Sequence, residues 1–197
     1  MTCTNPVIGV DLDDVLWDLK GAWLRRYNEI EDTNITAEDI KSWDIGKYVK
    51  PGTESVLFYI LEQNDFWETV KPVDGAQHYL NQLIEDGYDV YIVTASPHIH
   101  LKQKLIHFYK LFPFINPEQV VIIHRKQMMD LDVLIDDKPS NLCDASYKKI
   151  LFDCSHNRGF DEQQIGALRV TNWNDVYDFI CEEFPIGRRK IERDSNR

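Results

Sequence analysis

The sequence lacks the features that would direct a protein to a membrane or to secretion. No apolar run among its 197 residues reaches the about 20 residues that a membrane-spanning helix needs. Residues 1–6 contain neither a basic stretch nor a long apolar core, so a secretion signal is not expected. Repeats and low-complexity segments are absent as well. These absences predict a cytoplasmic protein with no membrane partner.

Cysteine is also scarce. The chain has four cysteines: Cys3, Cys143, Cys154 and Cys181. They lie far apart in the sequence, no pair has the CxxC spacing, and no histidine pattern completes a zinc site. Reduced thiols are therefore expected.

Positive charge is the third deficit. The chain has 22 Lys and Arg against 33 Asp and Glu, which gives a formal net charge of −11 at pH 7. Nucleic-acid polymers attract basic surfaces, so this acidic chain is not expected to bind one, although a nucleotide monomer remains compatible. The clustered basic residues fall at 188–197, after Pro185 and Gly187, where we expect a flexible tail.

What the sequence does contain is a series of short β-branched runs that alternate with helical patterns, which is typical of parallel strands joined by helices. The runs are apolar throughout, as in a sheet covered on both faces. Five strands are expected at residues 7–10, 90–93, 120–123, 133–135 and 150–152, and residues 168–171 are a candidate sixth. The sequence therefore predicts an α/β fold with a Rossmann-like parallel sheet flanked by helices.

The segment 18–73 departs from this rhythm. It is rich in aromatic residues, its patterns are helical, and Thr36 is a candidate helix cap before residues 37–39. The stretch between the first two strands is too long for an ordinary crossover. We predict that 18–73 forms a small helical cap, inserted after the first strand of a core made of 1–17 and 74–187.

Acidic residues follow two of the expected strands. Asp11 and Asp13 follow the first, and Asp136 and Asp137 follow the fourth. Ligands of open parallel sheets bind outside the carboxyl ends of the strands, where these carboxylates would converge. Two carboxylates about 4 Å apart repel by roughly 4 kcal/mol at an effective dielectric constant of about 20. Because oxygen ligands favour a hard cation, the pattern predicts a Mg²⁺ site.

A cation beside a free carboxylate suits phosphoryl transfer, since it offsets the charge that repels an attacking anion. Asp11 can then attack phosphorus and form an acyl phosphate, which divides one difficult displacement into two easier ones. Asp13 can protonate the leaving oxygen and later activate water. An aspartate after a strand is often only a turn former, but two acidic strand ends around a Val-Thr-Ala-Ser strand favour a phosphatase acting on a small phosphate ester.

Further residues are candidates for binding the substrate. Thr94, Ala95 and Ser96 end the second strand, and their hydroxyl and backbone groups can donate to phosphate oxygens. The candidates for a lysine near the transferred group are Lys102, Lys104 and Lys126. The candidates for stacking on a nucleobase are Trp17, Trp43, Phe66 and Trp67. For each aromatic residue, packing in the core is an equal alternative.

These motifs resemble those of the haloacid dehalogenase (HAD)-like phosphohydrolases. Residues 10–16 are similar to the first motif of that superfamily, 92–94 to the second and 135–137 to the fourth. The resemblance covers most of the chain, in the right order. Within the superfamily the sequence looks most like the 5′(3′)-deoxyribonucleotidases, because of the place of the helical insertion and the segments 66–68, 72–76, 94–97 and 134–139.

The resemblance implies a HAD-type fold with Asp11 as the nucleophile and Asp13 as the general acid and base. It implies Mg²⁺ held by the Asp11 carboxylate, the Asp13 main-chain carbonyl and Asp137, with Asp136 in support. The implied substrate is a nucleoside monophosphate, preferably a deoxynucleotide.

The resemblance also implies that Thr94 holds the phosphate. The lysine of the third motif matches Lys104 best, with Lys102 as the alternative, and Lys126 resembles a further lysine on the substrate side. Two positions depart from the family pattern: Asp14 stands where glycine is frequent, and Leu19 stands where an aromatic residue often faces the base.

Other functions remain as alternatives. The same chemistry can act on a sugar phosphate, the fold can serve a non-catalytic nucleotide-binding protein, and a related phosphatase can act on nucleic-acid ends. A homodimer is left open.

Overall fold

The computed structural model describes residues 5–186, and the predicted tail at 188–197 lies outside them. Six parallel strands form one sheet in the order β3-β2-β1-β4-β5-β6. The strands are β1 (Val7–Val10), β2 (Asp89–Thr94), β3 (Val120–Ile122), β4 (Val133–Asp136), β5 (Lys148–Phe152) and β6 (Leu168–Val170). Each expected strand is present, including the sixth, and its ends differ from the predicted ones by at most two residues.

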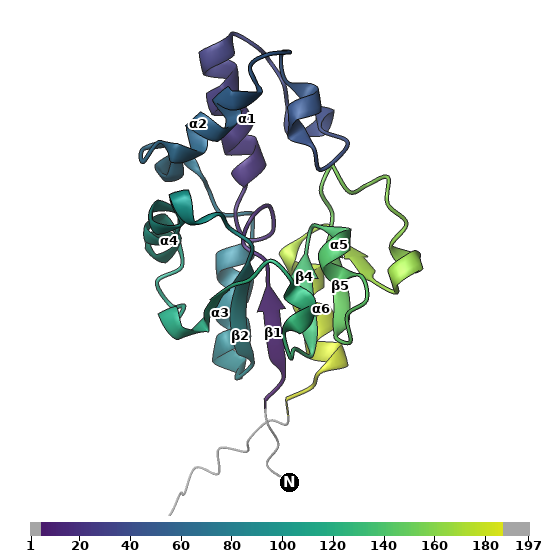
Figure 1. Cartoon of the computed structure of the whole chain (residues 1–197). Helices are drawn as coiled ribbons and strands as arrows, with labels where there is room; N and C mark the ends of the chain where they lie inside the picture. The colour runs from purple at the N-terminus through teal and green to yellow at the C-terminus, as the bar shows by residue number, and fades with distance from the viewer. Residues whose placement is uncertain (1–4, 187–197) are drawn as a thin grey trace, which may run out of the picture.

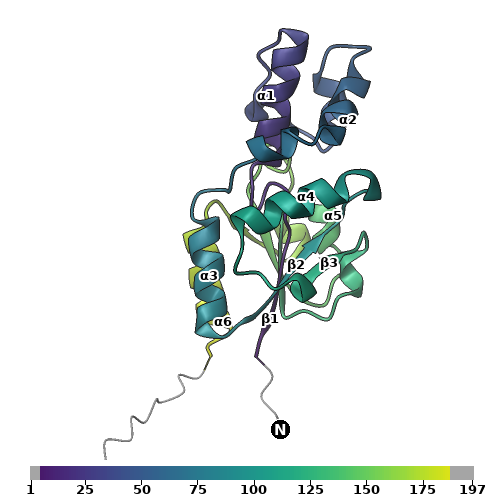
Figure 2. The same ribbon diagram turned by 90° about the vertical axis from the view of Figure 1, so that its left-hand side faces the viewer.

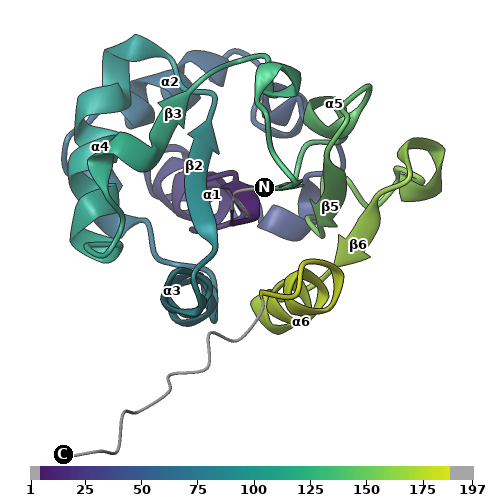
Figure 3. The same ribbon diagram turned by 90° about the horizontal axis from the view of Figure 1, so that it is seen from below.

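Helices cover both faces of the sheet, as the continuously apolar strands require. Helices α3 (Ala76–Asp86) and α6 (Trp173–Glu183) lie side by side along one face (Figure 3). Helix α4 (His98–Leu111) contributes to the same large core. The short helix α5 (Pro139–Leu142) contributes to a smaller core, built on the alternate strand residues that point to the other face. The predicted α/β, Rossmann-like architecture is confirmed.

The connection between β1 and α3, all of which the structure describes, contains helices and loops but no strand. Its elements are α1 (Leu19–Glu31), η1 (Ala37–Asp39), η2 (Ile45–Tyr48), α2 (Glu54–Glu62) and η3 (Phe66–Thr69). Thr36 forms the expected cap, because its side chain and that of Asp39 make a reciprocal capping box. These elements stand beyond the carboxyl ends of the strands (Figures 1 and 2).

The chain leaves and rejoins the core at adjacent points. Trp17 forms an isolated antiparallel bridge with Pro72. The backbone N–H of Asp18 donates to Lys71 at 2.8 Å, and that of Val73 donates to Leu16 at 2.9 Å. Two paired segments therefore connect the inserted helices to the core.

Three short helices complete the core: η4 (Pro117–Gln119), η5 (Lys126–Met128) and η6 (Glu162–Ile165). Strand β1 is central, with β2 on one side and β4 on the other. Because all strands are parallel, the residues that follow β1, β2, β4 and β5 reach the same edge of the sheet, beneath the inserted helices. Within residues 5–186, every helix is too short or too polar to cross a membrane.

Candidate active site

Asp11 lies at the centre of this edge. Its backbone N–H donates to the carbonyl of Ile135 at 2.9 Å, which joins the end of β1 to β4. Its carboxylate is buried and accepts a hydrogen bond from Lys126, whose Nζ also lies 2.6 Å from Oδ2 of Asp136. Burial raises the pKa of Asp11 to about 7, against the opposing effect of Lys126. Burial lowers the pKa of Lys126, but the two carboxylates outweigh it and raise that pKa overall.

Asp13 is held at both carboxylate oxygens. The Lys104 ammonium lies 2.5 Å from Oδ2, and the indole N–H of Trp17 donates to Oδ1 at 2.8 Å. The same ammonium lies 3.4 Å from both Oγ1 of Thr94 and Oγ of Ser96. Hydroxyl and ammonium donors thus converge beside an acid, an arrangement suited to binding phosphate oxygens next to a proton donor.

The two aspartates after β4 have different surroundings. Asp136 accepts hydrogen bonds from the backbone N–H of Lys138 at 2.8 Å and from the Asn141 amide at 3.1 Å. Asp137 is fully buried, yet both of its oxygens lack a hydrogen-bond partner among the described residues. Burial, together with the charges of Asp11 and Asp136, raises the pKa of Asp137 well above its usual value.

A cation would satisfy this group. Oxygens of Asp11, Asp136 and Asp137 lie within 4.8 Å of one another. Unpartnered buried carboxylate oxygens are costly, and an all-oxygen set suits a hard divalent ion. The residues therefore fit a divalent metal, in agreement with the sequence prediction.

The structure explains why Asp14 can stand where glycine is frequent. Its φ of 58° lies in the left-handed region, which glycine enters freely and aspartate tolerates better than most residues. In return, its carboxylate accepts from the backbone N–H of Lys20 at 2.8 Å and pairs with the Lys20 ammonium at 3.1 Å. A side chain at this position therefore fixes the first turn of α1.

Lys20 and His156 were not expected from the sequence. The Lys20 ammonium contacts Nδ1 of His156, and Nε2 of the same ring lies 3.1 Å from Oδ2 of Asp137. Burial and the neighbouring Lys20 lower the pKa of His156 to about 4. The available signal was the polar run after β5, residues 153–157, which ends at the same sheet edge as the aspartates.

The structure separates the three candidate lysines. Lys104 and Lys126 are buried in the site, whereas Lys102 is exposed on α4. The sequence favours Lys104 for the third-motif position, yet the lysine bonded to Asp11 is Lys126. Lys126 reaches Asp11 because η5 follows β3 and precedes β4 in the chain. Lys104, on α4, reaches Asp13 instead.

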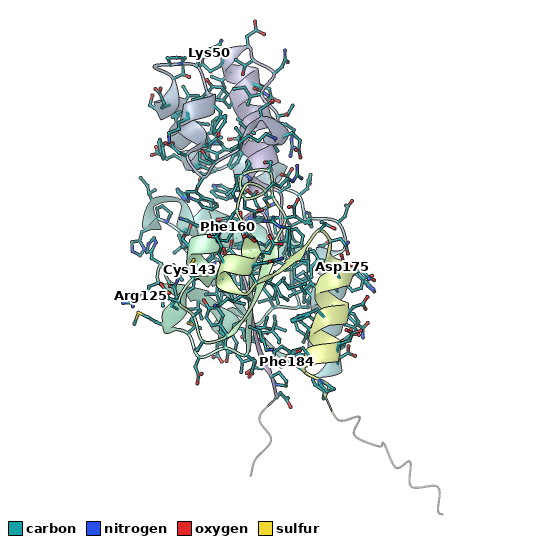
Figure 4. The ribbon with its side chains drawn as sticks, turned by 90° about the vertical axis from the view of Figure 1, so that its right-hand side faces the viewer. Lys50, Arg125, Cys143, Phe160, Asp175 and Phe184 are labelled. Atoms are coloured by element: carbon teal, nitrogen blue, oxygen red, sulfur yellow. The ribbon has the colours of Figure 1, made fainter. Side chains whose placement is uncertain are left out.

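The aromatic candidates for base stacking differ in their exposure. Phe66 and Trp67 are buried in the core and are not available to stack on a base, and Trp17 is buried against Asp13. Trp43 is 54% exposed, with the Lys138 ammonium 4.3 Å from its ring centroid. It lines a cavity of about 530 Å³ whose other residues include Cys143 and Phe160, which Figure 4 shows on the core beneath the inserted helices.

The fold is similar to that of solved HAD-like hydrolases. A HAD family hydrolase from Deinococcus radiodurans R1 superposes with a TM-score of 0.64 at 16% identity, over 90% of this chain and 96% of that chain. A haloacid dehalogenase-like protein from Agrobacterium tumefaciens gives 0.63 at 16% identity, over 91% and 99%. The predicted HAD-type fold is confirmed.

Sequence comparison then identifies the family. The model of the family "5' nucleotidase, deoxy (Pyrimidine), cytosolic type C protein" matches residues 5–184. A 5′(3′)-deoxyribonucleotidase of Clostridium acetobutylicum is 37% identical over 178 residues, which cover 90% of this chain and 96% of the relative. One of Bacillus subtilis is 34% identical over 172 residues, covering 86% and 95%. The chain belongs to this deoxyribonucleotidase family and is a phosphoric monoester hydrolase.

Proposed function

We propose that the chain hydrolyses deoxynucleoside monophosphates to nucleoside and phosphate, with Mg²⁺ as cofactor and a phosphoaspartate on Asp11 as intermediate. The observation that carries the proposal is the pairing of the buried Asp11 with Lys126, next to the unpartnered carboxylate of Asp137. The names of the relatives from Clostridium acetobutylicum and Bacillus subtilis support the substrate class.

The cation is proposed to be held by the carboxylates of Asp11 and Asp137 and the main-chain carbonyl of Asp13, with Asp136 in support. When bound, Mg²⁺ would supply positive charge that reduces the repulsion between the attacking carboxylate and the phosphate oxygens. Lys126 adds a second, permanent positive charge to Asp11 and Asp136.

In the first proposed step, a carboxylate oxygen of Asp11 attacks phosphorus, and the bond from phosphorus to the ester oxygen breaks. Asp13 donates a proton to the departing nucleoside oxygen. In the second step, Asp13 takes a proton from water, which attacks the same phosphorus and releases phosphate and the Asp11 carboxylate. Lys104, Thr94 and Ser96, with the backbone at Ala95, are proposed to bind the phosphate oxygens throughout.

The inserted segment 18–73 is proposed to act as a cap that limits the site to small substrates, over a core of 1–17 and 74–187. Its place beyond the carboxyl ends of the strands supports this role. The net charge of −11 supports a monomeric nucleotide over a nucleic-acid polymer.

A substrate panel tests the function. We expect phosphate release to be fastest on deoxynucleoside monophosphates, slower on ribonucleotides and sugar phosphates, and abolished by EDTA. The measurement is colorimetric phosphate release from each compound with Mg²⁺ or EDTA. Faster release from sugar phosphates would contradict the substrate class but keep the roles of Asp11 and Asp13. Turnover that persists in EDTA would contradict the proposed need for Mg²⁺. Faster release from an end-phosphorylated oligonucleotide than from monomers would contradict the proposal that the cap limits the site to small substrates.

Trp43 is proposed to stack on the base, because its ring is exposed in the cavity beside Lys138. Base stacking on an aromatic residue contributes about 1–3 kcal/mol. We therefore expect Trp43→Ala to raise KM for a deoxynucleotide roughly 5- to 150-fold while kcat and the KM for a sugar phosphate stay nearly constant. Phe58→Ala, which removes an exposed aromatic residue on α2, is the matched control. Equal KM values for Trp43→Ala and wild type would exclude the stacking role.

A further inference from the structure

A chain of four side chains runs from the inserted helices to the proposed metal site. Asp14 holds Lys20 at the start of α1, Lys20 contacts Nδ1 of His156, and Nε2 of His156 faces Asp137. The Lys20, His156 and Asp137 side chains are 13%, 2% and 1% exposed. None of these contacts is needed to close the sheet, and all of them converge on one carboxylate.

The contacts decide which ring nitrogen of His156 carries the proton. A charged lysine has three N–H donors and no acceptor, so Nδ1 must accept. The single proton of the neutral ring is then on Nε2, which lies 3.1 Å from Oδ2 of Asp137. Lys20 therefore sets the tautomer that presents an N–H to Asp137.

The loop that carries His156 is itself fixed. The Asn157 amide donates to the carbonyls of Asp137 at 2.7 Å and Phe152 at 2.8 Å. The Arg169 guanidinium donates to the side chain of Asn157 at 2.8 Å and to the carbonyl of Phe160 at 2.8 Å. The imidazole is thus held at a defined place relative to Asp137.

Asp137 lacks a hydrogen-bond donor, and the His156 ring can supply one. Both of its oxygens are buried without a hydrogen-bond partner, and the 3.1 Å approach of Nε2 to Oδ2 is not aligned as a hydrogen bond. A carboxylate that binds a metal through one oxygen is commonly fixed by a donor on the other. His156 is the group placed to provide that donor.

We propose that Lys20 and His156 act as a positioning pair, in which the N–H of His156 orients the Asp137 carboxylate for Mg²⁺ and Lys20 fixes the His156 tautomer. This inference rests on the proposed function, because it assumes that Asp137 binds the cation. Asp14 belongs to the same device, since its carboxylate holds Lys20 in place.

A second metal site is the competing interpretation, because Asp137, Cys154 and His156 also bring ligand atoms within 4.8 Å of one another. Three arguments oppose it. The proton on Nε2 occupies the position that a metal would need, and Lys20 places a positive charge against the ring. Burial also raises the pKa of the Cys154 thiol, which disfavours the thiolate that a metal requires.

The test is direct measurement of Mg²⁺ affinity by calorimetry, without substrate, on four variants of the full chain. We expect His156→Phe and Lys20→Met to weaken Mg²⁺ binding roughly 10- to 100-fold, and His156→Gln to recover most of the loss because its amide can donate in place of Nε2. Arg158→Ala is the matched control on the same loop, since its guanidinium is half-exposed and faces away toward Glu38 and Asp153. It should bind Mg²⁺ as the wild type does.

Thermal unfolding without Mg²⁺ accompanies each titration, so that a folding defect is seen separately; if His156→Phe fails to fold, Lys20→Met and His156→Gln carry the test. Mg²⁺ affinity within twofold of wild type in folded His156→Phe and Lys20→Met would overturn the proposed positioning role of Lys20 and His156. Equal weakening in Arg158→Ala would overturn it in favour of general loop support. Absence of Mg²⁺ binding by the wild type would instead overturn the metal assignment of the proposed function. Tighter binding of Zn²⁺ than Mg²⁺, lost in Cys154→Ala, would establish the second metal site.

Discussion

Replacing Asp11 with asparagine is expected to reduce phosphate release by ~10⁴-fold or more, the scale of losing a nucleophile. The same change should leave the metal-free protein as stable as the wild type or more stable. Burial raises the pKa of Asp11 to about 7, above its ordinary value, so the ionised carboxylate destabilises the folded state. An amide of the same shape removes that cost and leaves Lys126 paired with Asp136.

Two measurements check this result: phosphate release with Mg²⁺, and urea unfolding in EDTA. Asp130→Asn is a suitable control, because Asp130 is exposed outside the site and should tolerate the change in both assays. Full Mg²⁺-dependent activity in Asp11→Asn would rule out the phosphoaspartate mechanism. A large loss of stability would show that the buried carboxylate contributes to folding.

Replacing Lys126 with methionine should have the largest effect on stability. Lys126 is 1% exposed and is the cation paired with both Asp11 and Asp136. Removing one partner of a buried ion pair leaves charge uncompensated and costs ~3–5 kcal/mol. We expect a loss of that size in the free energy of unfolding in EDTA, with part of it restored by Mg²⁺. Phosphate release should fall as well.

Lys102→Met is the matched control, because Lys102 is exposed on α4. Its free energy of unfolding should change by no more than about 0.5 kcal/mol. Urea unfolding of both variants, with and without Mg²⁺, separates the cases. A Lys126→Met protein as stable as Lys102→Met in EDTA would mean that the carboxylates become protonated at little cost.

The sheet could be predicted from the sequence because each strand is a short, continuously apolar run bounded by polar residues. Parallel pairing then follows from the helical segments between them, and the acidic residues after β1 and β4 must meet once these strands are neighbours. The fold, and the meeting of Asp11, Asp136 and Asp137, could therefore be predicted from local sequence patterns.

The roles of the lysines were harder to predict. A lysine side chain is long, so its charge can lie far from the position of its Cα in the fold. Lys102 and Lys104 differ by two residues on α4, and helix geometry puts one in solvent and the other at Asp13. Lys126 reaches Asp11 only through the turn of η5. The aromatic residues were ambiguous for another reason. Phe66 and Trp43 each follow polar residues in the sequence, and only tertiary packing buries Phe66 and exposes Trp43.

His156 and Lys20 were missed because no periodicity marks them. Each is a single polar residue whose role appears only when α1 and the loop after β5 are brought together. Asp14 was noticed as an exception to the glycine pattern, but its meaning required the Lys20 contacts.

The central position of β1 also has a consequence for the order of events during synthesis. Val7–Val10 leaves the ribosome long before its partner β4, which begins only at Val133. Pairing over such a separation in sequence is slow, because a long loop must close before any contact forms. Lys126 emerges before Asp136 and Asp137. Asp11, the other carboxylate that Lys126 neutralises, emerges before Lys126. The site is complete only when the two aspartates after β4 have been made, so it forms late, as one event with the closing of the sheet.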